Sequence, residues 1–304
     1  MLQTGGFRAG DGQKYGTRAG TAQIATEHHI QAVRRTEGDP MNIFWHEFKS
    51  GLRSLLIWSG VMALFILLSV MKMAGYVNNP EMIAVLKAMP QAISAAFGLG
   101  PFDLTTLEGF FGVMFVYFAL IGAIAAATWG SGVLSREESG KTADFLLALP
   151  VSRSRVLTAK ALAALVNCLL FTLVTGVVSA LAVQSYQPEA GFYRLLVLEM
   201  EAMFLIELIF LAIGLMLASL LRPSWRAASV AIALILASYF AFAISNMSRD
   251  FDFLKYFTPF KYFDAAVFLR EGHLDGTYIL VSLLIVLASI AIVYVAYPRR
   301  DIYV

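Results

Sequence analysis

The chain has 304 residues, of which 59% are hydrophobic and only 14% are Asp, Glu, Lys or Arg. A soluble domain carries about 25% charged residues, so this composition predicts a chain that lies in a bilayer. The formal net charge of +2 is too small to indicate a nucleic-acid partner. The single cysteine, Cys168, excludes an internal disulfide. No Cys/His cluster is present either, so we expect no metal site.

Residues 1–40 differ from the rest of the chain. They are polar, contain six glycines before residue 21 and show no apolar periodicity. They also lack the apolar stretch of a secretory signal. We expect Met41 to be the natural start and residues 1–40 to be an upstream extension. The alternative is that they form a disordered tail, and in both cases no fold is expected of them.

Residues 41–55 have the pattern of an amphipathic helix. At 100° per residue their apolar side chains fall within one arc, with Ile43 as the exception. Beside a span, this pattern predicts an interfacial helix along the inner leaflet. The alternative is that these residues form the first turns of span one. The arc is made by Met41, Phe44, Trp45, Phe48, Leu52 and Leu55.

Six later segments are each apolar enough to cross a bilayer, which takes about 20 residues. The predicted fold is therefore an all-α membrane domain over residues 41–304. The fourth span has an alternative start near Leu195. The spans are Leu55–Tyr76, Phe111–Leu134, Leu162–Val183, Phe204–Leu221, Ala228–Ile244 and Tyr278–Tyr297.

Lys and Arg are dense in the short loops of one side, which predicts that this side is cytoplasmic. Both termini then lie inside, at the plasma (inner) membrane. On the other side, residues 80–97 and 253–270 are amphipathic or aromatic-rich. We expect these two segments either to cover the outer mouth of a pore or to lie in the interface. The inside basic residues are Lys49, Arg53, Arg136, Lys141, Arg153, Arg155, Lys160, Arg222, Arg226, Arg299 and Arg300.

The segment from Ser135 to Lys160 is a charged loop between the second and third spans. Residues 142–149 predict a short helix with one apolar face, which Pro150 ends. Ser152 is placed to cap the next helix. Two spans can be joined by far fewer residues, so the loop has the character of a docking surface.

This loop resembles that of the permease subunit of ABC transporters of the type-2 exporter superfamily, and the resemblance covers residues 41–304. In that family the loop carries a coupling helix that inserts into a separate cytosolic ATPase. The resemblance also implies that residues 41–55 correspond to the family's connecting, or elbow, helix. The resemblance implies an ATP-driven exporter with a homodimer or heterodimer of permeases. The implied coupling residues are Arg136, Glu137, Glu138, Gly140, Lys141, Thr142, Phe145, Leu146, Leu149, Pro150 and Arg153.

The stretch from Ser135 to Thr142 differs at one position from the phosphate-binding motif GxxxxGK[ST], because Ser135 stands in place of the first glycine. The motif also requires a preceding strand, whereas here a membrane span precedes it. We therefore expect no cofactor on this chain and no ATPase site of its own. ATP and Mg would bind the partner subunit.

Three glutamates lie near the start of span four. Carboxylates at membrane depth are costly and often functional, which makes Glu207 the candidate for a substrate path. Glu199 and Glu201 are expected at the solvated outer interface if the span begins at Phe204. An alternative function is an ion-coupled secondary transporter that uses Glu207. A membrane enzyme is disfavoured because no nucleophile–base or metal constellation is present.

In span two a small residue recurs at every fourth position, which forms a small-residue stripe along one face of the helix. Such stripes allow close packing of helices, within the subunit or across a dimer. The stripe is formed by Gly122, Ala126 and Gly130.

Overall fold

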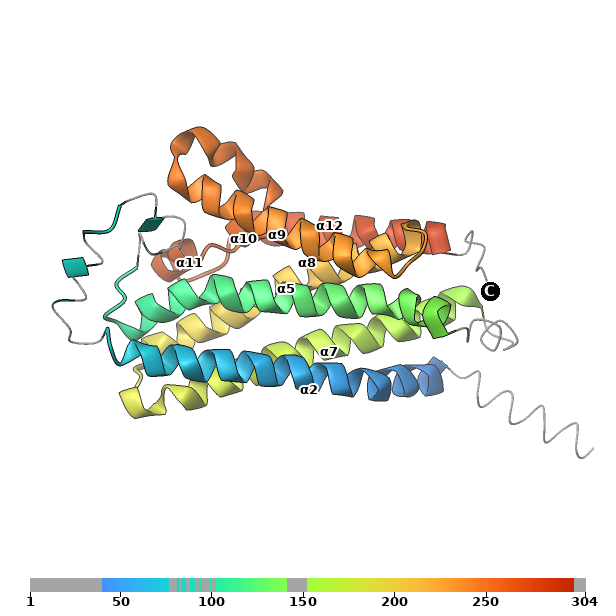
Figure 1. The fold of residues 1–304 in the computed structure, drawn as a ribbon, viewed down its shortest axis with the longest axis horizontal. Coiled ribbons are helices and arrows are strands. Elements are labelled where there is room, and N and C mark those ends of the chain that lie inside the picture. The colour runs from blue at the N-terminus through green and yellow to red at the C-terminus, as the bar shows by residue number, and fades with distance from the viewer. Residues whose placement is uncertain are drawn as a thin grey trace, which may run out of the picture.

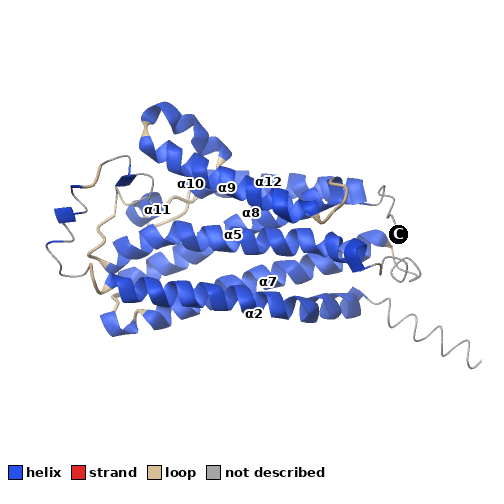
Figure 2. Cartoon of the chain, viewed as in Figure 1, coloured by secondary structure: helices blue, strands red, loops and turns tan. Residues whose placement is uncertain are grey.

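A computed structural model describes residues 40–76, scattered positions between 81 and 99, and residues 102–140 and 152–297. Six long helices account for most of these residues, and the described part contains no strand (Figures 1 and 2). Each of the six is long and apolar enough to cross a membrane, which confirms the predicted all-α, six-span fold. Their bounds are α2 Pro40–Met73, α5 Leu107–Gly140, α7 Arg153–Ala182, α8 Ala190–Leu220, α9 Arg226–Met247 and α12 Gly276–Ala296.

Helices α5 and α8 form the centre of the bundle and pack along each other. Helix α7 covers part of this pair, and α2 packs against α7. Helices α9 and α12 lie on the other side, where both contact α8 (Figure 1). The core consists of aromatic and small side chains, including Trp129 and Phe171, whose ring centroids lie 5.8 Å apart.

One end of the bundle gathers the start of α2, the end of α5, the start of α7, the turn between α8 and α9, and the end of α12 (Figure 1). These are the segments whose lysines and arginines predict a cytoplasmic face. The grouping agrees with an alternating six-span topology. Which end faces the cytoplasm remains a prediction from charge.

Helix α2 runs without a break from Pro40 to Met73. At 1.5 Å per residue this is about 50 Å, well beyond the ~30 Å of a hydrocarbon core. A separate elbow helix is therefore not confirmed, since residues 41–55 form the first turns of one helix. Ile43, the exception to the amphipathic arc, is the residue that packs against Val156 and Ala159 of α7.

The predicted arc on α2 remains partly open to the surroundings. Phe44, Trp45 and Phe48 form an aromatic cluster with ring centroids 5.6–6.1 Å apart, and Trp45 is 49% exposed. Leu52 lies one turn further along and is half-buried. The cluster lies near one end of the bundle, and its Trp45 is of a residue type that is enriched at membrane interfaces.

Helix α8 begins at Ala190, fourteen residues before the Phe204 of our prediction. Its early start follows the alternative near Leu195, because Phe192, Leu195 and Leu196 are all buried. The whole segment from 190 to 220 is one apolar helix, and the glutamates within it did not mark where it begins.

The aromatic-rich segment at the other end divides into two parts. In η2 (Arg249–Phe257), Phe253 and Phe257 are exposed. In α10 (Pro259–Tyr262) and α11 (Ala265–Glu271), Phe260 and Phe268 are buried, with ring centroids 6.0 Å from Phe210 and 5.4 Å from Phe115. The second half therefore packs over the bundle and the first half lies at its surface, while a role at a pore mouth or in the membrane interface stays a prediction.

Candidate functional site in the bundle interior

The small-residue stripe of α5 lies against α8. A Cβ atom added to Gly130 would lie 2.3 Å from the backbone oxygen of Leu211, and one on Gly214 would lie 2.6 Å from the oxygen of Ala127. Ala126 is fully buried in the same core. The structure thus places the stripe at a contact within the chain, where only glycine lets the two backbones approach so closely.

Glu207 of α8 lies at the point where α5, α7 and α8 meet. Its side chain is fully buried, and Thr172 of α7 donates a hydrogen bond of 2.9 Å from Oγ1 to Glu207 Oε2. The other oxygen, Oε1, has no hydrogen-bond partner among the described residues. A Cβ atom on Gly122 would lie 2.7 Å from Oε1, so the absence of a side chain there makes room for the carboxyl group.

Glu199 is fully buried as well, and neither of its carboxyl oxygens has a described partner. The expectation that it lies solvated at the interface was wrong, because α8 begins two and a half turns before it. Glu201 is exposed, as expected. The two buried glutamates are eight residues apart, so they lie on similar faces of α8, about 12 Å apart along its axis.

Hydroxyl groups of α7 accompany these carboxyls. Thr172, Thr175 and Ser179 are buried at helical spacing, and Ser179 Oγ has no described partner. Thr172 contacts Glu207, and a Cβ on Gly176 would lie 3.1 Å from Met200. Because Thr172 lies beside Glu207 and Gly176 beside Met200, α7 and α8 run antiparallel. Ser179 therefore lies at the level of Glu199. We call these five residues, Thr172, Thr175, Ser179, Glu199 and Glu207, the buried polar seam.

Sequence reasoning singled out Glu207 but missed the rest of the seam. A signal for it was present, since Thr172, Thr175 and Ser179 repeat every three to four residues within an apolar span. Burying a polar group without a partner costs free energy, and doing so at membrane depth usually accompanies a function.

A second polar cluster joins α2 and α7 at the end that holds the charged segments. Lys160 Nζ lies 2.7 Å from Glu47 Oε1, and the lysine side chain is only 5% exposed. Beside this pair, a cavity of about 10 Å³ is bordered by Asn167, whose Oδ1 has no described partner. A polar space of this size holds about one water molecule. The ion pair fixes the start of α7 to the start of α2.

The predicted docking segment lies largely outside the described residues. The backbone of α5 continues through residues 136–140, six residues beyond the predicted end of span two at Leu134, whereas α7 begins at Arg153 as expected. Ser152 stands at the N-cap of α7 as predicted, although its side chain makes no capping hydrogen bond. The predictions outside the described side chains concern Arg136, Glu137, Glu138, Gly140, Lys141, Thr142, Phe145, Leu146, Leu149 and Pro150.

The bundle carries no arrangement suited to metal chemistry in its described part. Among those residues, no group of three or more His, Cys, Asp and Glu side chains lies close enough to hold a metal ion. Cys168 is fully buried in the core. The described interior is therefore a set of packed helices with buried hydroxyl and carboxyl groups.

Six helices that are long and apolar enough to cross a membrane support a multi-pass membrane protein. A family model described as "ABC-2 family transporter protein" matches residues 41–302. The chain therefore belongs to the ABC-2 transporter family and is a permease, and the family implies an ATPase subunit as its partner. A comparison with curated proteins gives no match.

Proposed function

We propose that the chain is the permease half of an ATP-driven exporter, which converts the conformational change of a separate cytosolic ATPase into movement of a substrate out of the cell. The family match supports a permease. Export, the site of ATPase docking and the plasma (inner) membrane location are our inferences from the resemblance of the loop and from the charge distribution. The chain binds no nucleotide in this scheme.

The ATPase docks on residues 142–149, between Glu137 and Glu138 on one side and Arg153 on the other. The observation that carries this proposal is the amphipathic, charged sequence between α5 and α7. Helix α7 starts directly after it, and the Lys160–Glu47 ion pair ties that start to α2. A push on the docking segment would therefore move α7 and α2 together.

The path of the substrate involves Glu207. Its carboxyl group is held at the junction of three helices by a hydrogen bond from Thr172, and its other oxygen has no partner within the described part of the chain. Movement of α7 relative to α8 would expose this group. Two permeases pair around the path, as a homodimer or a heterodimer. Transport driven by ATP, and not by a proton gradient, separates this scheme from an ion-coupled transporter.

The docking proposal is tested by Leu146→Glu combined with Arg153→Glu. A pull-down from membranes should recover much less ATPase with this pair than with the wild-type chain. The matched control is Phe253→Glu with Lys255→Glu, which makes the same two kinds of change in η2 at the opposite end, where Phe253 is exposed and Lys255 is partly exposed. Undiminished association in the first pair would overturn the assignment of the segment.

A further inference from the structure

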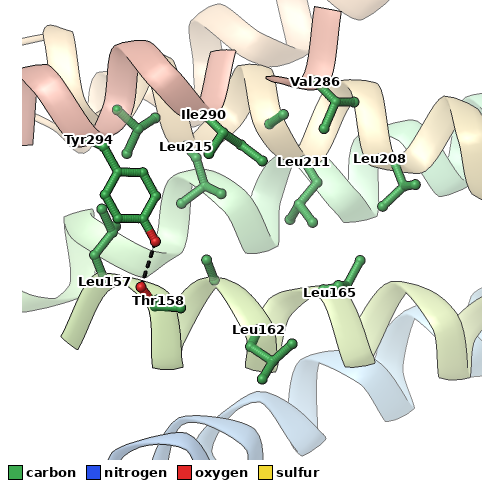
Figure 3. A pocket seen from close by; sticks show the side chains of 13 residues that line it. Leu157, Thr158, Leu162, Leu165, Leu208, Leu211, Leu215, Val286, Ile290 and Tyr294 are labelled. Carbon is green, nitrogen blue, oxygen red and sulfur yellow. Dashed lines mark hydrogen bonds between the residues drawn. The ribbon is translucent and has the colours of Figure 1, made fainter. Parts of the chain in front are cut away.

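A groove runs along the outside of the bundle between α7 and α12, with α8 as its floor (Figure 3). Its volume is about 250 Å³. Eleven of its 13 lining residues are Leu, Ala, Val or Ile, and the other two are Thr158 and Tyr294. The rim is open, because Leu162 is 49% exposed and Tyr294 is 38% exposed. The whole groove lies within membrane-crossing helices.

The groove is long and apolar enough for part of an acyl chain. Its lining on α7 extends from Leu157 to Leu165, which is about 12 Å at 1.5 Å per residue.

The groove is polar at one end only. Thr158 Oγ1 lies 2.5 Å from the hydroxyl of Tyr294, and this bridge closes the groove between α7 and α12 (Figure 3). Thr158 donates its proton to the backbone oxygen of Ser154, so Tyr294 donates to Thr158 and keeps lone pairs free to accept. This end points toward the face with the dense Lys and Arg residues.

A positive charge stands just beyond the polar end. Arg155 is exposed and precedes Thr158 by three residues, which places it on the same side of α7, one turn nearer the helix start. It forms no ion pair with the described residues. The guanidinium is thus positioned for an anionic group at membrane-interface depth, directly above an apolar channel.

We propose that this groove is a binding site for an anionic phospholipid, with one acyl chain between α7 and α12, the phosphate on Arg155 and a headgroup hydroxyl donating to Tyr294. Protein interiors are close-packed, whereas this groove is left open by the protein itself. The lipid fills that space. The site is separate from the buried polar seam, which lies on the inner side of α7. It is therefore a structural lipid site and not a part of the substrate path.

The test uses the purified full chain in mixed micelles of phosphatidylglycerol and phosphatidylcholine, with retained lipid counted by native mass spectrometry. The wild-type chain should retain one phosphatidylglycerol in preference to phosphatidylcholine. Ala161→Trp, which fills the groove, should lose that lipid. Ala237→Trp, at an exposed position on α9 outside the groove, should keep it.

Arg155→Gln separates the headgroup from the acyl chain. The variant should still retain a lipid, but its preference for phosphatidylglycerol should fall about fivefold, the effect of one arginine near a lipid surface. Retention by Ala161→Trp equal to that of the wild type would overturn the proposal. The proposal would also be overturned if Ala161→Trp lost dimers but retained the lipid unchanged. The occupant of the groove would then be a second copy of the chain.

Discussion

Helices α5 and α12 are both apolar enough to cross a membrane, yet they occupy opposite environments. In the most apolar 18 residues of each, 72% of the positions in α5 are buried, against 17% in α12. Lipid tails are as apolar as leucine, so hydrophobicity does not decide which helix lies at the centre. Small residues decide it, because Gly122 and Gly130 let α5 approach α8, whereas Gly276 of α12 has nothing within 4 Å.

The polar groups of the central helices and of α12 differ in the same way. The central helices enclose Glu199 and Glu207 with few partners in the described part, whereas α12 carries a long-range polar contact, Tyr294 with Thr158, at the surface. Changes in the centre should therefore cost much more than changes at the periphery. Cys168 is the only cysteine of the chain and is fully buried, so its reaction with a fluorogenic maleimide reports unfolding in each test below.

The largest effect is expected from Gly130→Ala. The new Cβ would lie 2.3 Å from the backbone oxygen of Leu211, which cannot move without shifting α8. We expect a loss of about 3 kcal/mol or more in the free energy of unfolding, since overpacking costs 1–3 kcal/mol even where side chains can adjust. Gly60→Ala is the control, because nothing lies within 4 Å of a Cβ there. Equal stability of the two variants would contradict the claim that small residues place α5 at the centre of the bundle.

Glu207→Ala should come next. It leaves a cavity and removes the acceptor of the Thr172 hydrogen bond, which together should cost about 2–3 kcal/mol. Glu207→Gln keeps an oxygen for Thr172 and should unfold within about 1 kcal/mol of the wild type. If the alanine variant is as stable as the glutamine variant, the hydrogen bond at the three-helix junction does not contribute.

Lys160→Ala tests the ion pair between α2 and α7. The change leaves the Glu47 carboxylate, whose side chain is 18% exposed, without its partner, and should cost about 2 kcal/mol. Lys160→Met combined with Glu47→Leu should recover most of this loss, because no lone charge remains. As a control, Lys255→Ala at the exposed Lys255–Asp252 pair should have no measurable effect. A double variant as unstable as Lys160→Ala would contradict this account.

The smallest effect concerns Tyr262 in α10, outside the spans. Its hydroxyl donates to the backbone oxygen of Tyr256, and Tyr262→Phe should cost about 1 kcal/mol. Burial, with a smaller contribution from Tyr278, raises the pKa of Tyr262. The folded state therefore favours the neutral phenol. The resulting stability is present below the usual tyrosine pKa of about 10 and is lost as pH rises through the raised value.

Unfolding measured between neutral and strongly alkaline pH checks this sign. The wild type should lose more stability above pH ~10 than Tyr262→Phe does. Parallel pH curves for the two proteins would show that Tyr262 does not titrate with unfolding.

The number and approximate places of the spans could be predicted because each needs about 20 apolar residues. The start of α8 could not, because Glu199 and Glu201 suggested an interface and only packing shows that Glu199 is enclosed. The first helix had the same difficulty, since an amphipathic arc describes an interfacial helix and the end of a span equally well. The stripe at Gly122 indicated a close contact, but its partner, α8, required the fold.

The most direct test of the central claim is a crosslink between the docking segment and the ATPase. Leu146→Cys, labelled with a photoreactive maleimide, should crosslink the ATPase in membranes, while the buried Cys168 stays unlabelled. Gln187→Cys, at an exposed position at the opposite end of the bundle, should give no such product. A product of equal yield from both positions, or from Gln187→Cys alone, would contradict a permease that engages its ATPase through residues 142–149.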